Sequence, residues 1–268
     1  MTPARETAYS APELLRGRTI QVVNYHETIA SSAPDDLHTV SDATFDTHLR
    51  IIEDSGVNVT RFPPARGTLA PASDIELLIT FDDGKSSDLR NAAKLAKRGW
   101  QGAFFISTAM IGQPGYLSKS QVRELHAMGM TIGSHGHDHV RLSTLSHDQA
   151  RTQLRRSKAE LEQLLGVAVD AMAFPGGDLN AALSVEAIRQ GYKTQFGTAW
   201  GANRLEGKMP LVWKRNNVIN TMDEQAFLDL ITLKCELRRR LMYWGRTVLH
   251  KHLPAQAYGQ LRVWLSAL

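Results

Sequence analysis

Acidic and histidine side chains stand directly after two apolar stretches of the sequence, and their types suit hydrolysis at a metal ion. Asp82 and Asp83 follow the apolar run 76–81, and His135 and His139 lie in the stretch GSHGHDHVRL at 133–142. Two histidines and one carboxylate can hold a divalent ion and still leave positions open for water and substrate. Asp83 is the natural third ligand, and Asp82 then stays available as a general base. His137 could instead contact substrate, support a ligand, or replace one.

The cysteine count and the charge distribution narrow the chemistry further. Cys235 is the only cysteine, which excludes an internal disulfide and a Cys-rich zinc site, so a metal must use histidines and carboxylates. Lys and Arg outnumber Asp and Glu by 31 to 27, and the excess is concentrated between residues 234 and 251. The body of the chain is therefore close to neutral.

The elements that must position these side chains alternate between strand and helix. The apolar runs 19–25, 76–81, 102–107, 131–134, 171–174, 193–197 and 211–213 read as strands, with helical patterns at 41–56, 87–98, 118–128, 146–165 and 184–190. This alternation predicts parallel βα units and an α/β barrel, in which the carboxyl ends of the strands share one face. We expect His26, Pro175–Gly177 and Arg215 to meet the acidic pair and the histidines there.

Several strings resemble motifs of the polysaccharide deacetylase, or NodB-homology, family, also known as carbohydrate esterase family four. TFDDG at 80–84 and SHGHDH at 134–139 are similar to its first two motifs, and VNYHE at 23–27, GAFFIST at 102–108 and AFPGG at 173–177 extend the likeness. The resemblance implies a distorted (β/α) barrel, often seven-stranded, that hydrolyses N-acetyl groups of amino sugars. It implies that Asp82 is the catalytic base and that Asp83, His135 and His139 bind a divalent metal, commonly Zn²⁺, with Co²⁺ or Ni²⁺ as alternatives.

The sequence departs from the usual family pattern at two positions. The late Leu-x-His motif is absent, and we assign the general acid to His26, as in members that deacetylate biofilm poly-N-acetylglucosamine; a structural histidine is the alternative. Ala173 stands where many members have an arginine that orients the base, and Arg215 could supply that charge. Tyr25, Pro175, Gly176, Gly177 and Trp213 are predicted to line the substrate groove, although Pro175–Gly177 could be an ordinary turn and Trp213 could pack in the core.

The predicted organisation is a polar leader at 1–18, the deacetylase domain at 19–222 and a basic, amphipathic helical extension at 223–268. Residues 227–268 interleave apolar and basic side chains, which is typical of helices that lie on anionic membranes, whereas a helix packed on the barrel is the alternative. The start of the chain lacks the hydrophobic core of a secretory signal, and no window approaches the ~20 apolar residues of a membrane span. We therefore expect a cytoplasmic protein, peripheral to the inner face of the membrane.

Three functions are compatible with this sequence. The first is metal-dependent N-deacetylation of a polysaccharide or its lipid-linked precursor. The second keeps the chemistry on another small amide, for example as a deformylase, and the third is an inactive glycan-binding relative. The complete set Asp82, Asp83, His135 and His139 argues against the third. A nucleic-acid partner is not expected, because the basic tail lacks the aromatic platform of single-strand binders.

Overall fold

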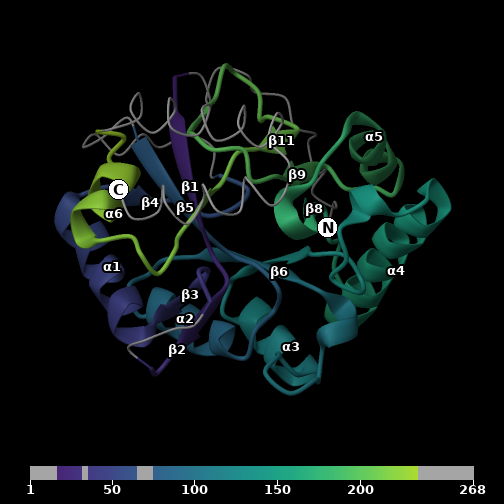
Figure 1. Ribbon diagram of the computed structural model, residues 1–268, viewed down its shortest axis with the longest axis horizontal. Coiled ribbons are helices and arrows are strands. Elements are labelled where there is room, and N and C mark those ends of the chain that lie inside the picture. Colours follow the sequence, from purple (N-terminus) through teal and green to yellow (C-terminus); the bar gives the residue numbers. More distant parts are fainter. Residues whose placement is uncertain (1–16, 32–35, 65–74, 235–268) are drawn as a thin grey trace, which may run out of the picture. The chain divides into compact units, whose positions relative to one another are not determined.

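Strands and helices alternate along the described part of the chain (Figure 1). The computed structural model describes residues 17–31, 36–64 and 75–234. Its elements are β1 (Thr19–Tyr25), β2 (Glu27–Ile29), β3 (Thr39–Ser41), α1 (Asp42–Ser55), β4 (Asn58–Val59), β5 (Ile75–Phe81), α2 (Ser87–Ala96), β6 (Gly102–Ile106), α3 (Lys119–Ala127), β7 (Thr131–Ser134), α4 (His147–Leu165), β8 (Ala171–Ala173), α5 (Ala181–Arg189), β9 (Thr194–Phe196), β10 (Asn203–Arg204), β11 (Val212–Trp213), β12 (Asn216–Asn217) and α6 (Glu224–Ile231).

The main sheet curls into a nearly closed barrel. Its strands follow the order β10-β1-β5-β6-β7-β8-β9-β11, and every pair from β1 to β11 is parallel. The stretch 212–217 joins the two ends, because β11 pairs with β9 and β12 pairs with β1. If β11 and β12 are counted as one strand, the barrel wall in the described residues consists of seven strands: β1, β5, β6, β7, β8, β9 and the β11–β12 stretch. The predicted α/β barrel is confirmed.

Successive side chains of each strand point alternately into the barrel and out toward the helices. The interior cluster contains Ile20, Val22, Leu78, Phe105 and Trp213, together with further buried apolar side chains. The outward side chains form a second cluster with the helices that surround the sheet, and its members include Val23, Tyr25, Leu77, Ile79, Phe81, Phe45 and Leu49. On each strand, the side chain two residues beyond the last interior residue points into the barrel as well, and it lies at the barrel mouth.

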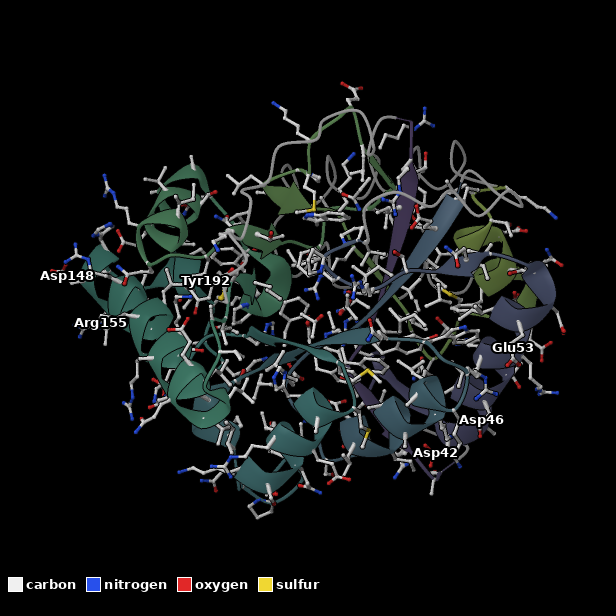
Figure 2. The ribbon with its side chains drawn as sticks, turned by 180° about the vertical axis from the view of Figure 1, so that it is seen from behind. Asp42, Asp46, Glu53, Asp148, Arg155 and Tyr192 are labelled. Atoms are coloured by element: carbon white, nitrogen blue, oxygen red, sulfur yellow. The ribbon has the colours of Figure 1, made fainter. Side chains whose placement is uncertain are left out.

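Helix boundaries follow from local capping. Ser41 accepts a hydrogen bond from the Thr44 backbone at the start of α1, and Gly56 ends that helix in the left-handed conformation. Three ion pairs then join α1 to α2 and the turn that follows it: Asp42 with Arg90, Asp46 with Lys94 and Glu53 with Arg98. Figure 2 shows their acidic members along α1. Because these pairs are at least partly exposed, each contributes at most about 1 kcal/mol to stability.

Helix α6 belongs to the barrel unit, whereas the sequence had placed residues from 223 onward in a separate extension. The compact unit that contains α6 ends at Thr232. Phe227 and Ile231 are buried, the Phe227 ring stacks on His48 with 3.8 Å between ring centroids, and Gln21 donates a hydrogen bond to the Leu230 carbonyl. The apolar side of α6 is thus buried and does not face a membrane.

The predicted basic segment beyond α6 lies mostly at residues 235–268, outside the described residues. Its helical, membrane-binding character stays a prediction. Within the described residues, no helix combines the length and the apolar composition that crossing a membrane requires.

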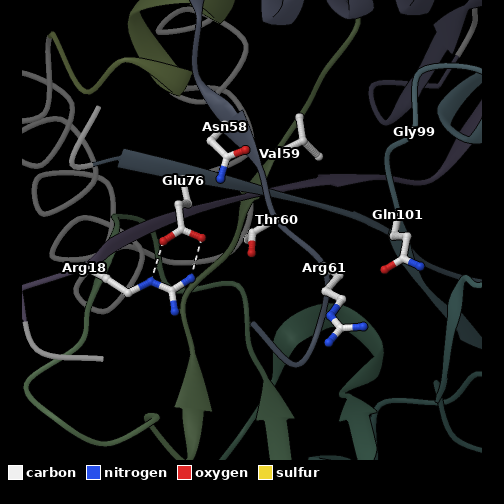
Figure 3. Close-up of a pocket in the computed structure, with 8 residues that line it drawn as sticks. All are labelled: Arg18, Asn58, Val59, Thr60, Arg61, Glu76, Gly99 and Gln101. Atoms are coloured by element: carbon white, nitrogen blue, oxygen red, sulfur yellow. Dashed lines mark hydrogen bonds and ion pairs between the residues drawn. The ribbon is translucent and has the colours of Figure 1, made fainter. Parts of the chain in front are cut away.

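The end of the barrel where the strands begin holds a cavity of about 240 Å³ (Figure 3). A buried ion pair between Arg18 and Glu76 lies in its wall, together with Thr60, Arg61 and Gln101. Arg18, which the sequence had assigned to the polar leader, is therefore part of the folded barrel. The side chains considered below lie at the opposite end, where the strands finish.

Candidate active site

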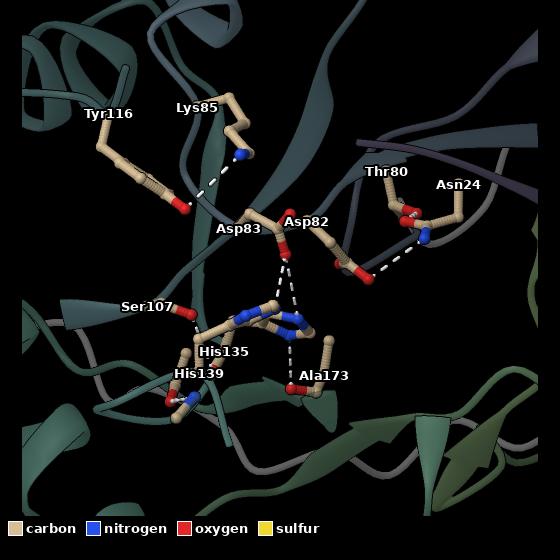
Figure 4. A network of polar contacts seen from close by, with 12 residues as sticks. Asn24, Thr80, Asp82, Asp83, Lys85, Ser107, Tyr116, His135, His139 and Ala173 are labelled. Carbon is tan, nitrogen blue, oxygen red and sulfur yellow. Dashed lines mark hydrogen bonds and ion pairs between the residues drawn. The ribbon is translucent and has the colours of Figure 1, made fainter. Parts of the chain in front are cut away.

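Side chains predicted to do chemistry converge at the carboxyl ends of the barrel strands, and Figure 4 shows four of them: Asp82, Asp83, His135 and His139. Asp82 and Asp83 directly follow β5, His135 directly follows β7, and Arg215 lies between β11 and β12. Because neighbouring strands are parallel, their ends deliver these residues to one mouth. The structure thus brings together side chains that are up to 133 positions apart in sequence.

Three of these side chains form a cluster suited to a metal ion. Ligand atoms of Asp83, His135 and His139 all lie within 4.8 Å of one another. Oδ1 of Asp83 is 2.8 Å from Nε2 of His139 and 3.5 Å from Nε2 of His135. Two imidazoles and one carboxylate are the donor set of hydrolytic zinc sites, with room for further ligands. The predicted ligands are therefore those that the fold brings together.

A second contact orients the ring of His135 toward Asp83. Nδ1 of His135 lies 2.8 Å from the Ala173 carbonyl. Because a carbonyl can only accept, Nδ1 carries the proton and Nε2 presents its lone pair to the cluster. Ala173, which replaces the arginine of many family members, thus contributes through its backbone.

Backbone strain is concentrated at two of the proposed ligands. Among described non-glycine residues, only Asp83 (φ 78°), His139 (φ 55°) and Leu233 have positive φ. Such conformations cost about 1–3 kcal/mol each and persist where surrounding structure holds them. The turn at Gly84 packs against Ile106, and the Asp83 carbonyl accepts a hydrogen bond from the Ser107 backbone. These contacts hold the Asp83 turn in a conformation that an isolated chain would avoid.

The electrostatics of the cluster favour a cation. Burial would raise the pKa of Asp83, but the neighbouring histidines His135 and His139 hold it well below its usual range. The hydrogen bond to Asp83 raises the pKa of His139. The carboxylate is therefore ionised and attracts a proton onto the neighbouring histidine, so a divalent ion at this position would satisfy the same negative charge. The residues present fit a divalent metal.

Asp82 sits beside this cluster in a different environment. It is 3% exposed, and Arg215 grips both of its carboxylate oxygens, with Nη1 2.7 Å from Oδ1 and Nη2 2.8 Å from Oδ2. Burial alone would raise the pKa of Asp82, but the Arg215 charge and hydrogen bonds, aided by His135, lower it. Arg215 is 1% exposed and lies over the Phe105 ring. The predicted pairing of Arg215 with the candidate base is present in the structure.

Asn24 is a further polar residue at Asp82 that was not predicted from the sequence. Its Nδ2 donates to Oδ2 of Asp82 at 3.1 Å, and its Oδ1 accepts from Nη1 of Arg215 at 2.8 Å. The signal that could have found it is strand alternation, because Asn24 follows the interior residues Ile20 and Val22 at a spacing of two. An amide at an interior barrel position needs polar partners, and Asp82 provides one.

His26 lies at the end of β1, partly buried, near the acidic pair. Burial lowers the pKa of His26 to about 4, although the charges of Asp82 and Asp83 oppose the shift. Its ring packs against His38, with 4.8 Å between centroids. The structure therefore places His26 on the predicted face, while a role as general acid stays a prediction.

His137 points away from the proposed metal ligands. Its Nδ1 lies 2.7 Å from the Thr108 hydroxyl and 3.1 Å from a carboxylate oxygen of Glu160 on α4. The His137 side chain is 7% exposed. These contacts tie the histidine motif to α4, so of the alternatives for His137 the structure favours support of the site over metal binding.

Two predicted substrate contacts are wrong in this structure. Tyr25 is 1% exposed, faces outward from β1 onto Phe45 and Phe81, and its hydroxyl lies 3.0 Å from Nδ1 of His48. Trp213 is fully buried among the interior side chains. Tyr25 belongs to the set of β1 side chains that point outward, and Trp213 lies inside the barrel one layer below Arg215, so neither side chain reaches the barrel mouth.

The turn Pro175–Gly177 lies beside the histidine motif. A Cβ on Gly136 would stand 3.5 Å from the Pro175 ring, Gly176 is exposed, and both glycines of the turn have positive φ. A Cβ on Gly177 would lie 1.9 Å from the Thr198 hydroxyl, so only glycine fits there. This location is compatible with the predicted groove, and contact with substrate stays a prediction.

Lys85 and Tyr116 form a polar pair near Asp83 that was also missed. Nζ of Lys85 lies 3.4 Å from the Tyr116 hydroxyl and 3.7 Å from a carboxylate oxygen of Glu27. Both Lys85 and Tyr116 are partly buried. The pKa of Lys85 is raised: burial would lower it, but the charges of Glu27, Tyr116 and Asp83 prevail. A cation is therefore held next to the cluster.

Comparisons with known proteins agree with this geometry. Residues 70–195 match the family model described as polysaccharide deacetylase. A putative polysaccharide deacetylase of Bacillus subtilis, YxkH, is 26% identical over 164 residues; the match covers 59% of this chain and spans 58% of that protein's length.

Solved structures share the fold. The Streptococcus pyogenes deacetylase PplD, in complex with acetate, has a TM-score of 0.67 and 22% identity, with 80% of this chain and 98% of that chain covered. IcaB from Ammonifex degensii has a TM-score of 0.67 and 24% identity, with 79% and 95% covered. The family match thus covers residues 70–195, and the likeness to the solved structures is one of fold.

Proposed function

We propose that this protein is a metal-dependent hydrolase that removes acetyl groups from N-acetylated amino sugars in a polysaccharide or its lipid-linked precursor. One observation carries the proposal: an ionised aspartate, Asp82, is clamped by Arg215 directly beside a two-histidine, one-aspartate cluster at the mouth of a barrel. Deacetylation needs a group that takes a proton from water and a cation that stabilises the oxyanion. Asp82 would take the proton, and the cluster of two histidines and one aspartate would hold the cation.

Asp83, His135 and His139 would hold the metal. A divalent ion there, most naturally Zn²⁺ with Co²⁺ or Ni²⁺ as alternatives, would act as a Lewis acid toward the acetyl carbonyl and lower the pKa of water. The lone pair on Nε2 of His135 is already directed by its contact with Ala173. The chain therefore presents its ligands before the ion arrives.

Asp82 takes the proton of the attacking water in this proposal. Its pKa is lowered mainly by Arg215 against the effect of burial, so the carboxylate is ionised at neutral pH and ready to accept. Arg215 donates a hydrogen bond to each carboxylate oxygen and thereby limits rotation of the carboxylate toward solvent. The pair would thus supply a base whose position is fixed.

His26 is the proposed general acid for the departing amine. Because burial lowers its pKa to about 4, His26 is neutral at neutral pH in the substrate-free protein. To protonate the amine, His26 must first take up a proton, and the proton that Asp82 removes from the attacking water would balance this transfer. We propose this role for His26, and substrate contacts for Pro175–Gly177, because these residues lie near the barrel mouth.

The substrate class is inferred from likeness. IcaB and a deacetylase in complex with acetate share this fold at 22–24% identity, and the Tyr25–His26 strand end resembles the biofilm poly-N-acetylglucosamine type. We therefore propose a GlcNAc-type polymer or its lipid-linked precursor. A small amide and an inactive glycan-binding protein are the competing outcomes of the test below.

The test is acetate release from N-acetylglucosamine oligomers by the full chain, after chelation and after Zn²⁺ or Co²⁺ is restored. We expect release only with metal, and a fall of roughly 10²–10⁴-fold in Asp82→Asn. Asp138→Asn is the matched control, because Asp138 belongs to the histidine motif but its side chain is 51% exposed and lies against Gln153 and His137, outside the proposed metal ligands. Metal binding without release would favour a lipid-linked or small-amide substrate, whereas absence of metal binding would favour a binding protein.

A further inference from the structure

Asn24 makes contacts that distinguish the two oxygens of the Asp82 carboxylate. Oδ2 of Asp82 accepts two hydrogen bonds, from Nη2 of Arg215 at 2.8 Å and from Nδ2 of Asn24 at 3.1 Å. Oδ1 accepts one, from Nη1 of Arg215 at 2.7 Å. A carboxylate has about four lone-pair sites, two on each oxygen. Among the described residues, Oδ2 is therefore saturated and Oδ1 keeps one site open.

The orientation of the Asn24 amide is fixed by its neighbours. Oδ1 of Asn24 lies 2.8 Å from Nη1 of Arg215, which can only donate, and 2.8 Å from the Thr80 hydroxyl. Nδ2 of Asn24 must then face Asp82, which as a carboxylate can only accept, and it also donates to Oδ1 of Asn217 at 3.1 Å. Reversing the amide would place donor against donor at Arg215 and acceptor against acceptor at Asp82.

We infer that Asn24 is a positioning residue that saturates Oδ2 of Asp82 and thereby makes Oδ1 the oxygen that accepts the proton from water. The inference rests on the proposed role of Asp82 as the base. Arg215 alone binds both oxygens with nearly equal geometry and cannot make this choice. The third hydrogen bond from Asn24 breaks that symmetry and also resists rotation of the carboxylate about its Cβ–Cγ bond.

Burial increases the importance of the hydrogen bond between Asn24 and Asp82. Asn24 is fully buried and Asp82 is 3% exposed, so water cannot readily replace a lost donor. Asn24 touches none of the three proposed metal ligands in the described contacts, so its removal should leave metal affinity in place. The expected signature is thus a change in the rate of the chemical step without a change in binding.

Two substitutions separate positioning from space filling. Asn24→Ala removes all four side-chain contacts, including the one to Asp82, and we expect kcat to fall roughly 10–100-fold, the size of one hydrogen bond to a charged group, with KM and metal affinity within about twofold of wild type. Asn24→Asp refills the volume and, as an ionised carboxylate, can still accept from Arg215 and Thr80 but cannot donate to Asp82. We expect Asn24→Asp to leave kcat at least as impaired as Asn24→Ala does.

Asn216→Ala is the matched control. Asn216 is also a buried barrel asparagine, but its Nδ2 donates to the Val22 and Gly201 carbonyls and it has no contact with Asp82. Its variant reports the cost of removing a buried amide elsewhere in the barrel. We expect kcat of Asn216→Ala to change less than about threefold at temperatures where the variant stays folded.

Crystal structures of the Asn24→Ala and Asn216→Ala variants give a readout that does not depend on activity. The Asp82 carboxylate should rotate or occupy two conformers in Asn24→Ala only; an unchanged carboxylate there would overturn the inference whatever the substrate proves to be. Restoration of kcat by Asn24→Asp, or an effect confined to KM, would also overturn it. Failure of the proposed function itself would appear separately, as wild-type protein that releases no acetate.

Discussion

Replacing Arg215 with methionine should destabilise the barrel by much more than an ordinary charge removal. Arg215 and Asp82 are 1% and 3% exposed, and their two hydrogen bonds of 2.7 and 2.8 Å are bidentate. Removing one member of such a pair leaves the other charge buried and unpaired, which costs about 3–5 kcal/mol. For a chain of this size, that corresponds to a fall in melting temperature of roughly 6–20 °C.

The pH dependence of this loss has a defined sign. Arg215 lowers the pKa of Asp82, so the pair contributes stability that is present above the unfolded pKa of aspartate and is lost as pH falls through the folded pKa. In Arg215→Met the buried carboxylate can escape its penalty by taking a proton. The stability gap between wild type and variant should therefore be largest at neutral pH and narrow in acid.

Denaturant unfolding at pH 7 and pH 4.5 measures both effects. Arg90→Met is the matched control, because the Arg90 side chain is 49% exposed in its ion pair with Asp42 and should contribute less than about 1 kcal/mol to stability. If Arg215→Met cost no more than this control, or if its cost grew in acid, the account of a clamped, ionised Asp82 would be refuted.

Three further changes test other parts of the structure. Asp88 is fully buried, and burial together with the charge of Asp83 raises its pKa, so the folded protein becomes less stable as rising pH ionises Asp88. Asp88→Asn should therefore raise the melting temperature measured by calorimetry, by roughly 2–4 °C per kcal/mol recovered and more at pH 8 than at pH 5. Tyr25→Phe removes the contact to His48 and should destabilise by about 0.5–1.5 kcal/mol while KM changes less than twofold. Gly177→Ala should cost at least about 1–3 kcal/mol in denaturant unfolding.

The barrel and its proposed metal ligands were predictable because local signals agreed. Apolar runs ended on charged residues at 82–83 and at 135, and the helix signals were capping residues that the structure uses, such as Ser41 and Gly56 around α1. The parallel alternation then required the strand ends to meet. No knowledge of side-chain contacts was needed for that step.

The wrong predictions for Tyr25 and Trp213 concern which way a strand side chain points and how deep in the barrel it lies. Tyr25 and Trp213 were judged by residue type and nearness to the site, yet one faces the outer helices and the other lies a layer too deep. Counting in steps of two from Val22 would have excluded Tyr25 and selected Asn24. Helix α6 was misassigned because an apolar face at 227–231 has the same pattern whether it covers a barrel or a membrane.

The most direct test of the central claim is a titration of the metal-free full chain with Zn²⁺, with acetate release from N-acetylglucosamine oligomers measured at each addition. If Asp83, His135 and His139 form one site, activity should rise in proportion to added metal and saturate near one equivalent. Full activity in the metal-free protein, or bound metal that brings no acetate release from any amide substrate, would contradict the account.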